Sequence, residues 1–355
     1  MDAITGRLAT ETATLRARME VLTRQSVSGM RADAYGDLAP EAPRALSLRA
    51  ELGRREAYSR ALDQSLGRTA AMQASLGRMG EIAREFGAGV ARRLSSTDPS
   101  TLTAVPARAQ AALREVAGLL NTRHVGEFLL SGTELTRAPI PAEATIGSGP
   151  MAAAVAGEVA SLAPGNSAAV LAAIRGHSAD LALSPFNAHL VADAALPPGS
   201  REAPRAVPSG DGEAIGYGVF AHRNSAAVPS PDPTSGGWAQ DLLGSLMALA
   251  SLTPAQLAAG PDFDRLAAGL SATLMSAHSA LAEEQGVLGL TERRIEATRE
   301  RHGTVTIALA KQLADIQEVN LADTLTRLQS TRTTLEASYR AIGALGELTL
   351  ARFLN

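Results

Sequence analysis

The sequence predicts a mainly α protein whose N- and C-terminal arms form a long antiparallel helical hairpin, or coiled-coil bundle, with an inserted central domain that contains β-structure. Two observations support this prediction. Both ends of the chain carry heptad patterns of apolar residues, and 12 of the 18 prolines fall between Pro139 and Pro233, with none after Pro261. Because proline breaks helix interiors, the long helices are expected in the two ends.

The apolar heptad positions near the two ends define two seams. They are Leu8, Leu15 and Leu22 in the N-terminal arm, and Leu321, Leu328, Leu335 and Ile342 in the C-terminal arm. Leu325, Thr331, Tyr339 and Leu345 lie near the intervening positions of the C-terminal seam. Residues seven apart lie on one face of a helix, and so narrow an apolar stripe is marginally stable in water unless it is covered. We therefore expect the seams to pack against each other or against further copies of the chain. An antiparallel bundle inside a monomer would produce the same periodicity.

The elements of the N-terminal half follow in order. Residues 4–29 are expected to form a first helix, which Ser28-Gly29 ends because glycine readily adopts the left-handed conformation found at helix ends. Residues 31–43 read as a loop that contains two prolines. A long helix is expected over residues 44–94, and a further helix over residues 102–121.

The return arm begins at Asp262, which is placed to cap a helix that extends to about residue 291 and continues past Gly303 into the C-terminal seam. Three glycines in this arm, Gly286, Gly289 and Gly303, are candidate kink positions. The absence of proline from this arm supports helix along its whole length.

The central part of the chain has a different composition, rich in Pro, Gly, Ala and Ser and poor in charge. Its clearest strand follows the turn signal Asp211-Gly212. There the residues on one face, Ile215, Tyr217, Val219 and Ala221, alternate with Gly216, Gly218, Phe220 and His222. We therefore predict three domains. Residues 1–35 and 315–355 form a terminal coiled-coil domain for assembly, residues 36–140 and 238–314 form a helical-arm domain, and residues 141–237 form the central β-containing domain.

Composition excludes several functional classes. The chain has no cysteine and a formal net charge of -3, so it offers no thiol chemistry and no basic field for nucleic acid. No two of the six histidines are three or four residues apart, so no helical metal pair exists. We expect no catalytic residues, cofactor or metal, and no membrane span, since no apolar run approaches about 18 residues. The first residues resemble no cleaved secretory signal peptide.

Three passages carry a resemblance to a known family. The passage over residues 22–31 resembles the N-terminal region of flagellin-like proteins. The passage N-T-R-H-V-G-E-F-L-L-S-G-T over residues 121–133 is similar to one in the hook-associated proteins of the flagellar hook–filament junction. The C-terminus, L-E-A-S-Y at residues 335–339 and then residues 345–354, is similar to the end of the same family. The motif positions are Ser28, Gly29, Arg31, Asn121, Arg123, Gly126, Ser131, Gly132 and Thr133.

The resemblance implies a structural subunit of the bacterial flagellum, extracellular and exported without a cleaved signal peptide. Its terminal helices would pack with copies of itself in a ring that joins hook to filament, and the central insert would project outward with few contacts to the axial core. Further partners would be hook-side and filament-side flagellar proteins and an export chaperone. The terminal seams are expected to be poorly ordered in the free monomer and to fold on assembly. A filament flagellin, a cytoplasmic coiled-coil adaptor and an unrecognised enzyme are the alternatives.

Overall fold

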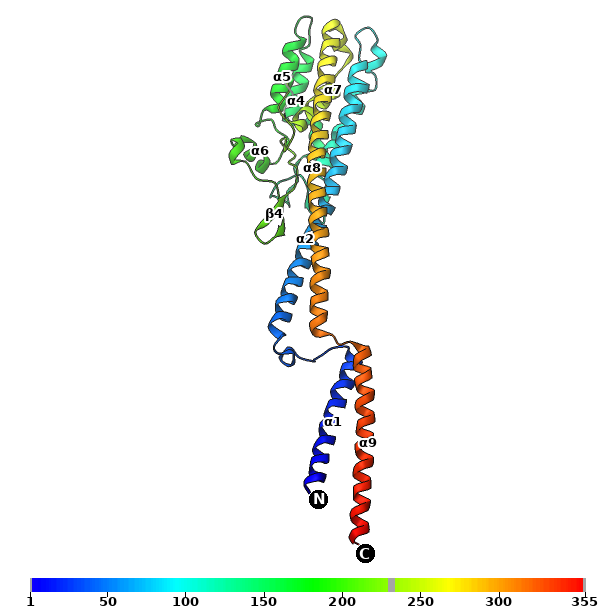
Figure 1. Ribbon diagram of the computed structural model, residues 1–355. Coiled ribbons are helices and arrows are strands. Elements are labelled where there is room, and N and C mark those ends of the chain that lie inside the picture. The colour runs from blue at the N-terminus through cyan, green and yellow to red at the C-terminus, as the bar shows by residue number, and fades with distance from the viewer. Residues whose placement is uncertain (1, 229–233, 354–355) are drawn as a thin grey trace. The chain divides into compact units, whose positions relative to one another are not determined.

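The computed structural model in Figure 1 describes residues 2–228 and 234–353, and it describes no side chain before residue 6 or after residue 344. The described residues are mainly helical, which confirms the predicted class. The α-helices are α1 (Asp2–Ser28), α2 (Ala42–Arg84), α3 (Val105–Leu120), α4 (Pro150–Ala160), α5 (Ser167–Ala179), α6 (Ala188–Ala195), α7 (Trp238–Ser251), α8 (Pro261–Gln317) and α9 (Leu321–Phe353).

Two small antiparallel sheets accompany the helices. In the first, β1 (Arg123–His124) pairs with β2 (Glu127–Phe128), and in the second, β3 (Ala206–Gly210) pairs with β4 (Glu213–Gly216). Val207 lies opposite Ile215 in the second hairpin, and both side chains are buried.

The chain divides into two compact units. Unit 1 consists of residues 1–57 and 301–355, and unit 2 consists of residues 58–300. Helices α2 and α8 each contribute residues to both units. The three domains inferred from the sequence remain a prediction.

In unit 1, α1 and α9 pack against each other in antiparallel orientation. The side chain of Arg16 bonds to Tyr339, whereas Met30 bridges to Glu318, so partners run in opposite directions along the two helices. Gly29 ends α1 with a φ of 72°, as expected, and its carbonyl accepts a hydrogen bond from the Val319 N–H at 2.9 Å. This bond fixes the end of α1 beside the start of α9.

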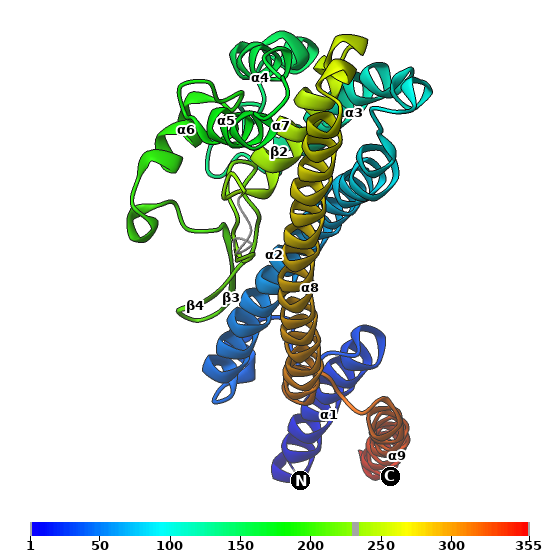
Figure 2. The same cartoon turned by 90° about the horizontal axis from the view of Figure 1, so that it is seen from above.

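In unit 2, Gly77 of α2 and Gly87 of the π-helical turn that follows α2 allow close approach to α8. A Cβ atom on Gly87 would lie 3.1 Å from Leu274, and one on Gly77 would lie 3.1 Å from the side-chain amide of Gln285. Gln73 and Gln285 also exchange hydrogen bonds from each side-chain amide to the other's backbone carbonyl, at 2.9 and 3.3 Å. Higher residue numbers along the first arm therefore pair with lower residue numbers along α8, so the two helices are antiparallel here (Figure 2).

The central segment differs from its prediction. It is mostly helical, with α4, α5 and α6 beside one β-hairpin, and α4 and α5 both pack against α7. One continuous apolar core joins Val155 and Ile174 of this segment to Leu242 of α7 and Leu270 of α8. The central segment therefore shares its core with the helical arms, and an inserted domain with its own core is not confirmed.

Two element boundaries also differ from prediction. Helix α2 ends at Arg84, before a π-helical turn at Glu85–Val90, where the Ser271 hydroxyl donates to the Gly87 carbonyl at 2.9 Å. Strand β4 ends at Gly216, earlier than the predicted alternation up to Ala221, and Gly218 has a φ of 124° that no strand adopts. By contrast, α8 is a single helix through Gly286, Gly289 and Gly303.

Candidate assembly surface

The contact between α1 and α9 is formed by side chains at alternating spacings of four and three residues. On α1, Thr12 and Leu22 are buried, and on α9 the buried residues are Thr324, Thr331 and Leu335. Leu8, Leu15, Met19, Leu328 and Ser338 are partly buried at the intervening positions. This spacing keeps one face of each helix directed at the other.

The predicted seam residues divide into two groups. Leu8, Leu15, Leu22, Leu328 and Leu335 are buried or partly buried. Leu321 and Ile342 are instead 48% and 37% exposed, and the side chain of Leu345 lies outside the described residues. That any of these seam residues packs one subunit against another remains a prediction.

Apart from Thr331, the hydroxyl residues in the same contact were not among the predicted seam positions. The buried Thr12 hydroxyl donates to the Leu8 carbonyl of its own helix at 2.9 Å, which satisfies the hydroxyl without a partner on α9. Thr324, Thr331 and Ser338 occupy the facing stripe of α9. They continue the heptad register, so the signal was present in the sequence, but hydroxyl side chains are not apolar and escape a count of leucines. Each such layer buries less apolar surface than a leucine layer, which weakens the helix pair.

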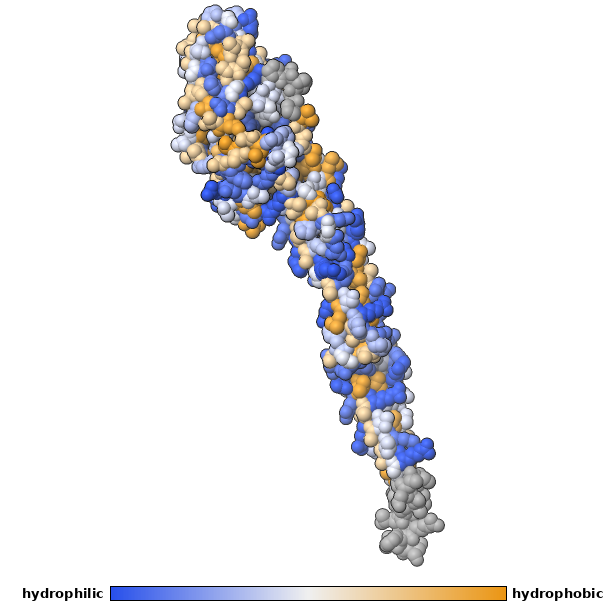
Figure 3. Space-filling model, turned by 90° about the vertical axis from the view of Figure 1, so that its left-hand side faces the viewer, coloured by the Kyte–Doolittle hydropathy of each residue, from blue (hydrophilic) through white to orange (hydrophobic). Residues whose placement is uncertain are grey.

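Beside the seam, α9 carries an apolar flank that the chain leaves uncovered. We define this flank as Leu321, Leu325 and Tyr339, which are 48%, 53% and 40% exposed. At 100° per residue these three positions lie within about 40° of one another around the helix. On the face that Figure 3 displays, apolar residues alternate with hydrophilic ones along the long helices.

The motif positions after α1 shape a chain reversal in unit 1. The Ser28 hydroxyl accepts a hydrogen bond from the Met30 N–H at 3.2 Å, and Gly29 adopts a positive φ. Arg31 forms an ion pair with Glu41 at 3.2 Å across the following loop. These three residues therefore have local structural roles in the described chain.

In unit 2, the motif that begins at Asn121 starts with a reciprocal bond. The Asn121 side chain donates to the Ile140 carbonyl and accepts from the Ile140 N–H, both at 2.9 Å. Arg123 stacks on the Phe128 ring at 4.1 Å. The hairpin between them turns through Val125 and Gly126, whose φ values are 51° and 81°.

The Ser131-Gly132-Thr133 end of this motif is a second tight turn. The buried Ser131 hydroxyl donates to the Glu134 carbonyl at 2.8 Å, and the Thr133 carbonyl accepts from the Leu135 N–H at 3.0 Å. Gly132 has a φ of 69°, and a Cβ atom there would lie 2.9 Å from the Glu202 carboxylate oxygens. Only glycine fits this position without displacing Glu202.

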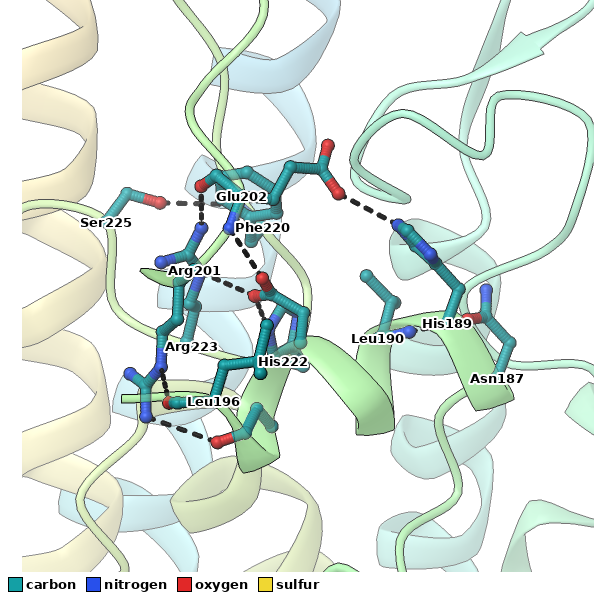
Figure 4. A network of polar contacts seen from close by, with 12 residues as sticks. Asn187, His189, Leu190, Leu196, Arg201, Glu202, Phe220, His222, Arg223 and Ser225 are labelled. Carbon is teal, nitrogen blue, oxygen red and sulfur yellow. Dashed lines mark hydrogen bonds and ion pairs between the residues drawn. The ribbon is translucent and has the colours of Figure 1, made fainter. Parts of the chain in front are cut away.

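A buried polar network lies close to that turn in unit 2, and no sequence pattern predicts it (Figure 4). One carboxylate, Asp193 of α6, accepts from the Glu202 N–H at 2.6 Å and from Nε2 of His222 at 2.8 Å. Arg223 lies 3.3 Å from the same carboxylate, and His189 contacts the Glu202 side chain at 2.8 Å. His222 and Asp193 are 29 residues apart in the chain, so no local pattern links them.

Burial decides the protonation of this network. Desolvation, assisted by the positive charges of Arg223 and Arg201, lowers the pKa of His222 to about 4 against the opposing effect of Asp193. Burial raises the pKa of Asp193, but the Glu202 N–H, Arg223 and His222 outweigh that effect and hold this pKa below its usual value. At neutral pH the pair is therefore a neutral imidazole that donates to a carboxylate.

Within residues 2–228 and 234–353, no group of three or more histidine or acidic side chains is arranged to hold a metal ion. In the same part of the chain, no helix combines the length and the apolar character that a membrane crossing requires. Comparisons with protein-family models and with curated proteins gave no match.

Proposed function

We propose that this chain is a structural subunit of the bacterial flagellum, of the flagellin-like type, that joins hook to filament through packing of its terminal helices. The sequence resemblance over residues 22–31, 121–133 and 335–354 supports this assignment, because the passages occur in the family's order and lie near both ends and in the first half of the chain. The antiparallel contact of α1 with α9 is the geometry that such an assembly uses.

The observation that carries the proposal is the exposed flank of Leu321, Leu325 and Tyr339 beside the α1–α9 seam. A single chain covers only part of the apolar face of α9. Covering the rest against a second copy would stabilise the contact by roughly 1 kcal/mol for each half-exposed leucine. A ring or short stack provides many such contacts at once, so weak individual contacts are sufficient.

In this proposal the arms form a long antiparallel hairpin that acts as a coiled coil in the assembly. Residues 141–237 are an insertion between the arms that shares its core with α7 and α8, and it is not an independent appendage. The partners are copies of this chain together with hook-side and filament-side flagellar proteins, and an export chaperone before assembly. The location is extracellular.

Immunogold labelling of isolated hook–basal bodies tests the proposal. We expect gold at the distal end of the hook in cells that express the protein, and shed filaments in cells that lack it. Label along the whole filament would indicate a filament flagellin. Protein confined to the cell pellet, with no label on any flagellar structure, would indicate a cytoplasmic adaptor and would overturn the proposal.

A further inference from the structure

One carboxylate of α6 bonds to both segments that flank the β3–β4 hairpin of unit 2. Asp193 accepts from the Glu202 N–H, on the segment that enters β3, and from His222, on the segment that leaves β4. Its oxygens lie 2.6 Å from the first donor and 2.8 Å from the second. The flanks are also joined by a bond from the Tyr217 N–H to the Arg205 carbonyl, so Asp193 is the part of this base that involves a titratable partner.

The hairpin packs on the long helices through a small apolar cluster of its own. Val207, Ile215 and Tyr217 are buried against Leu62 of α2 and Ile295 of α8. Near the hairpin turn, the Tyr58 hydroxyl donates to Asp211 at 2.8 Å. This cluster is separate from the main core of unit 2, so the hairpin can separate from the helices without disrupting that core.

The charges around His222 balance only while its imidazole is neutral. The charged groups that face it are Asp193 of α6, Arg223 beside it in the chain, and Arg201 and Glu202 on the entering segment. His189 of α6 contacts Glu202, and from α7 the neutral Gln240 side chain bonds to the His222 carbonyl. Two arginines and two carboxylates cancel, so a proton on His222 would add an uncompensated charge.

The geometry gives that added proton no acceptor. His222 is 3% exposed, its Nε2 already donates to Asp193, and its buried Nδ1 has no hydrogen-bond partner. The rings of Phe220 and Phe186 lie edge-on to the imidazole, with centroids at 5.8 and 6.5 Å. A buried donor without an acceptor, on a charged ring between two arginines, is strongly unfavourable.

We infer that Asp193 and His222 form an acid-operated latch, in which protonation of the imidazole releases the base of the β3–β4 hairpin from α6 and uncovers Leu62 and Ile295. The latch is closed at neutral pH. It opens when the medium becomes acidic enough to protonate this histidine, and it closes again when the proton leaves. The inference concerns unit 2 alone and does not depend on the flagellar assignment.

Hydrogen exchange of the hairpin backbone tests the latch in the full-length chain. Protection of residues 206–216, corrected for the intrinsic pH dependence of exchange, should fall at least about tenfold between about pH 7 and about pH 3 in the unsubstituted protein. His222→Gln keeps an N–H donor for Asp193 but cannot take up a proton. This variant should retain hairpin protection over the same range.

His189→Gln is the matched control, because His189 also bonds to a carboxylate but its ring is 29% exposed. It should behave like the unsubstituted protein. If hairpin protection stays constant on acidification of the unsubstituted protein, or falls equally in His222→Gln, the inference is wrong. If His222→Gln does not fold, an NMR titration of His222 decides: the midpoint of hairpin opening must coincide with that of the imidazole, and separate midpoints refute the latch.

Discussion

Arg16 of α1 donates a hydrogen bond from Nε to the hydroxyl of Tyr339 of α9, and its guanidinium carbon lies 5.1 Å from the centre of the Tyr339 ring. The two residues are 323 positions apart, so this contact ties the ends of the chain together. It also sets which residues of α1 face which residues of α9. Tyr339 belongs at the same time to the exposed flank, and thus links the seam within the chain to the surface proposed for assembly.

We expect Arg16→Ala and Tyr339→Ala to show an interaction free energy of about 0.5–1 kcal/mol in a double-mutant cycle. The value is modest because both side chains are largely exposed and water screens the contact. Thermal unfolding of unit 1, monitored through hydrogen exchange of the α9 amides, measures this interaction free energy. Arg7→Ala is the matched control, since Arg7 pairs with Glu11 of its own helix, and it should be additive with Tyr339→Ala. A cycle with no coupling would mean that the helices are not held in this register in solution.

Substitutions at two leucines of α9 distinguish the effect of the seam on folding from the effect of the flank on assembly. Leu335 is 6% exposed in the seam, whereas Leu325 is 53% exposed on the flank. Leu335→Asp should separate α9 from α1, because it places a charge in a covered apolar contact. Leu325→Asp should leave the monomer folded and secreted but prevent hook–filament attachment.

The readouts for these leucine variants are hydrogen exchange of α9 in the monomer and motility of cells that carry each variant. Thr333→Asp, an exposed position on another side of α9, should affect neither. Normal motility of Leu325→Asp would show that the flank is not an assembly surface.

The long helices could be predicted from the sequence because their evidence is local and periodic. The helix expected at residues 102–121 corresponds closely to α3. The helix expected from residue 262 into the C-terminal seam is instead interrupted at residues 318–320, between α8 and α9. The sequence does not predict α4, α5 and α6, because the prolines of the central segment argue against helix. Pro150 is instead the first residue of α4, where the missing N–H has no helical partner to lose.

The seam could be predicted only in part, for a related physical reason. Heptad spacing identifies one apolar stripe, but the partner helix covers one side of that stripe, and this decides which leucines are buried. Leu328 is therefore partly buried while Leu325, three residues earlier, remains largely exposed. The Asp193–His222 network lay beyond sequence reasoning, because its charges converge only after α6 and the hairpin flanks have packed together.

Because the central segment shares the core of unit 2, removing part or all of this segment should destabilise the unit. Ile174 of α5 is 2% exposed in the core that also contains Leu242 and Leu270. We expect Ile174→Ala to lower the free energy of unfolding of unit 2 by about 2–5 kcal/mol. Deletion of residues 142–237 should unfold the unit altogether. Denaturant titration monitored by Trp238 fluorescence measures the effect in each variant, since Trp238 lies outside the deleted residues.

Leu290→Ala on α8 is the control for the core substitution, because Leu290 is 61% exposed. Its effect should stay within about 0.5 kcal/mol. A deletion variant that keeps cooperative unfolding and full helix content would show that the central segment is dispensable for the core.

The final prediction concerns Asp262 at the start of α8, which holds the turn between α4 and α5. Its carboxylate accepts from the Ser167 hydroxyl at 2.5 Å and from the Gly165 N–H at 2.8 Å. These two hydrogen bonds lower the pKa of Asp262 from 3.8 to about 2, and the bond from Ser167 has the larger effect. Because the folded-state pKa lies below the unfolded one, the ionised carboxylate stabilises unit 2 fully above pH 3.8, and this stabilisation is lost as the pH falls from 3.8 toward 2.

Urea unfolding of unit 2 at a series of acidic pH values measures this contribution. The unsubstituted protein should lose stability across the window, and Asp262→Asn should lose correspondingly less, because the variant has no proton to take up at this position. Ser167→Ala keeps the carboxyl group but removes the hydroxyl donor, so the pKa of Asp262 should rise toward its usual value and the pH-dependent part of the stability should shrink. Identical pH slopes for the unsubstituted protein and Asp262→Asn would show that Asp262 is not held as an anion by this turn.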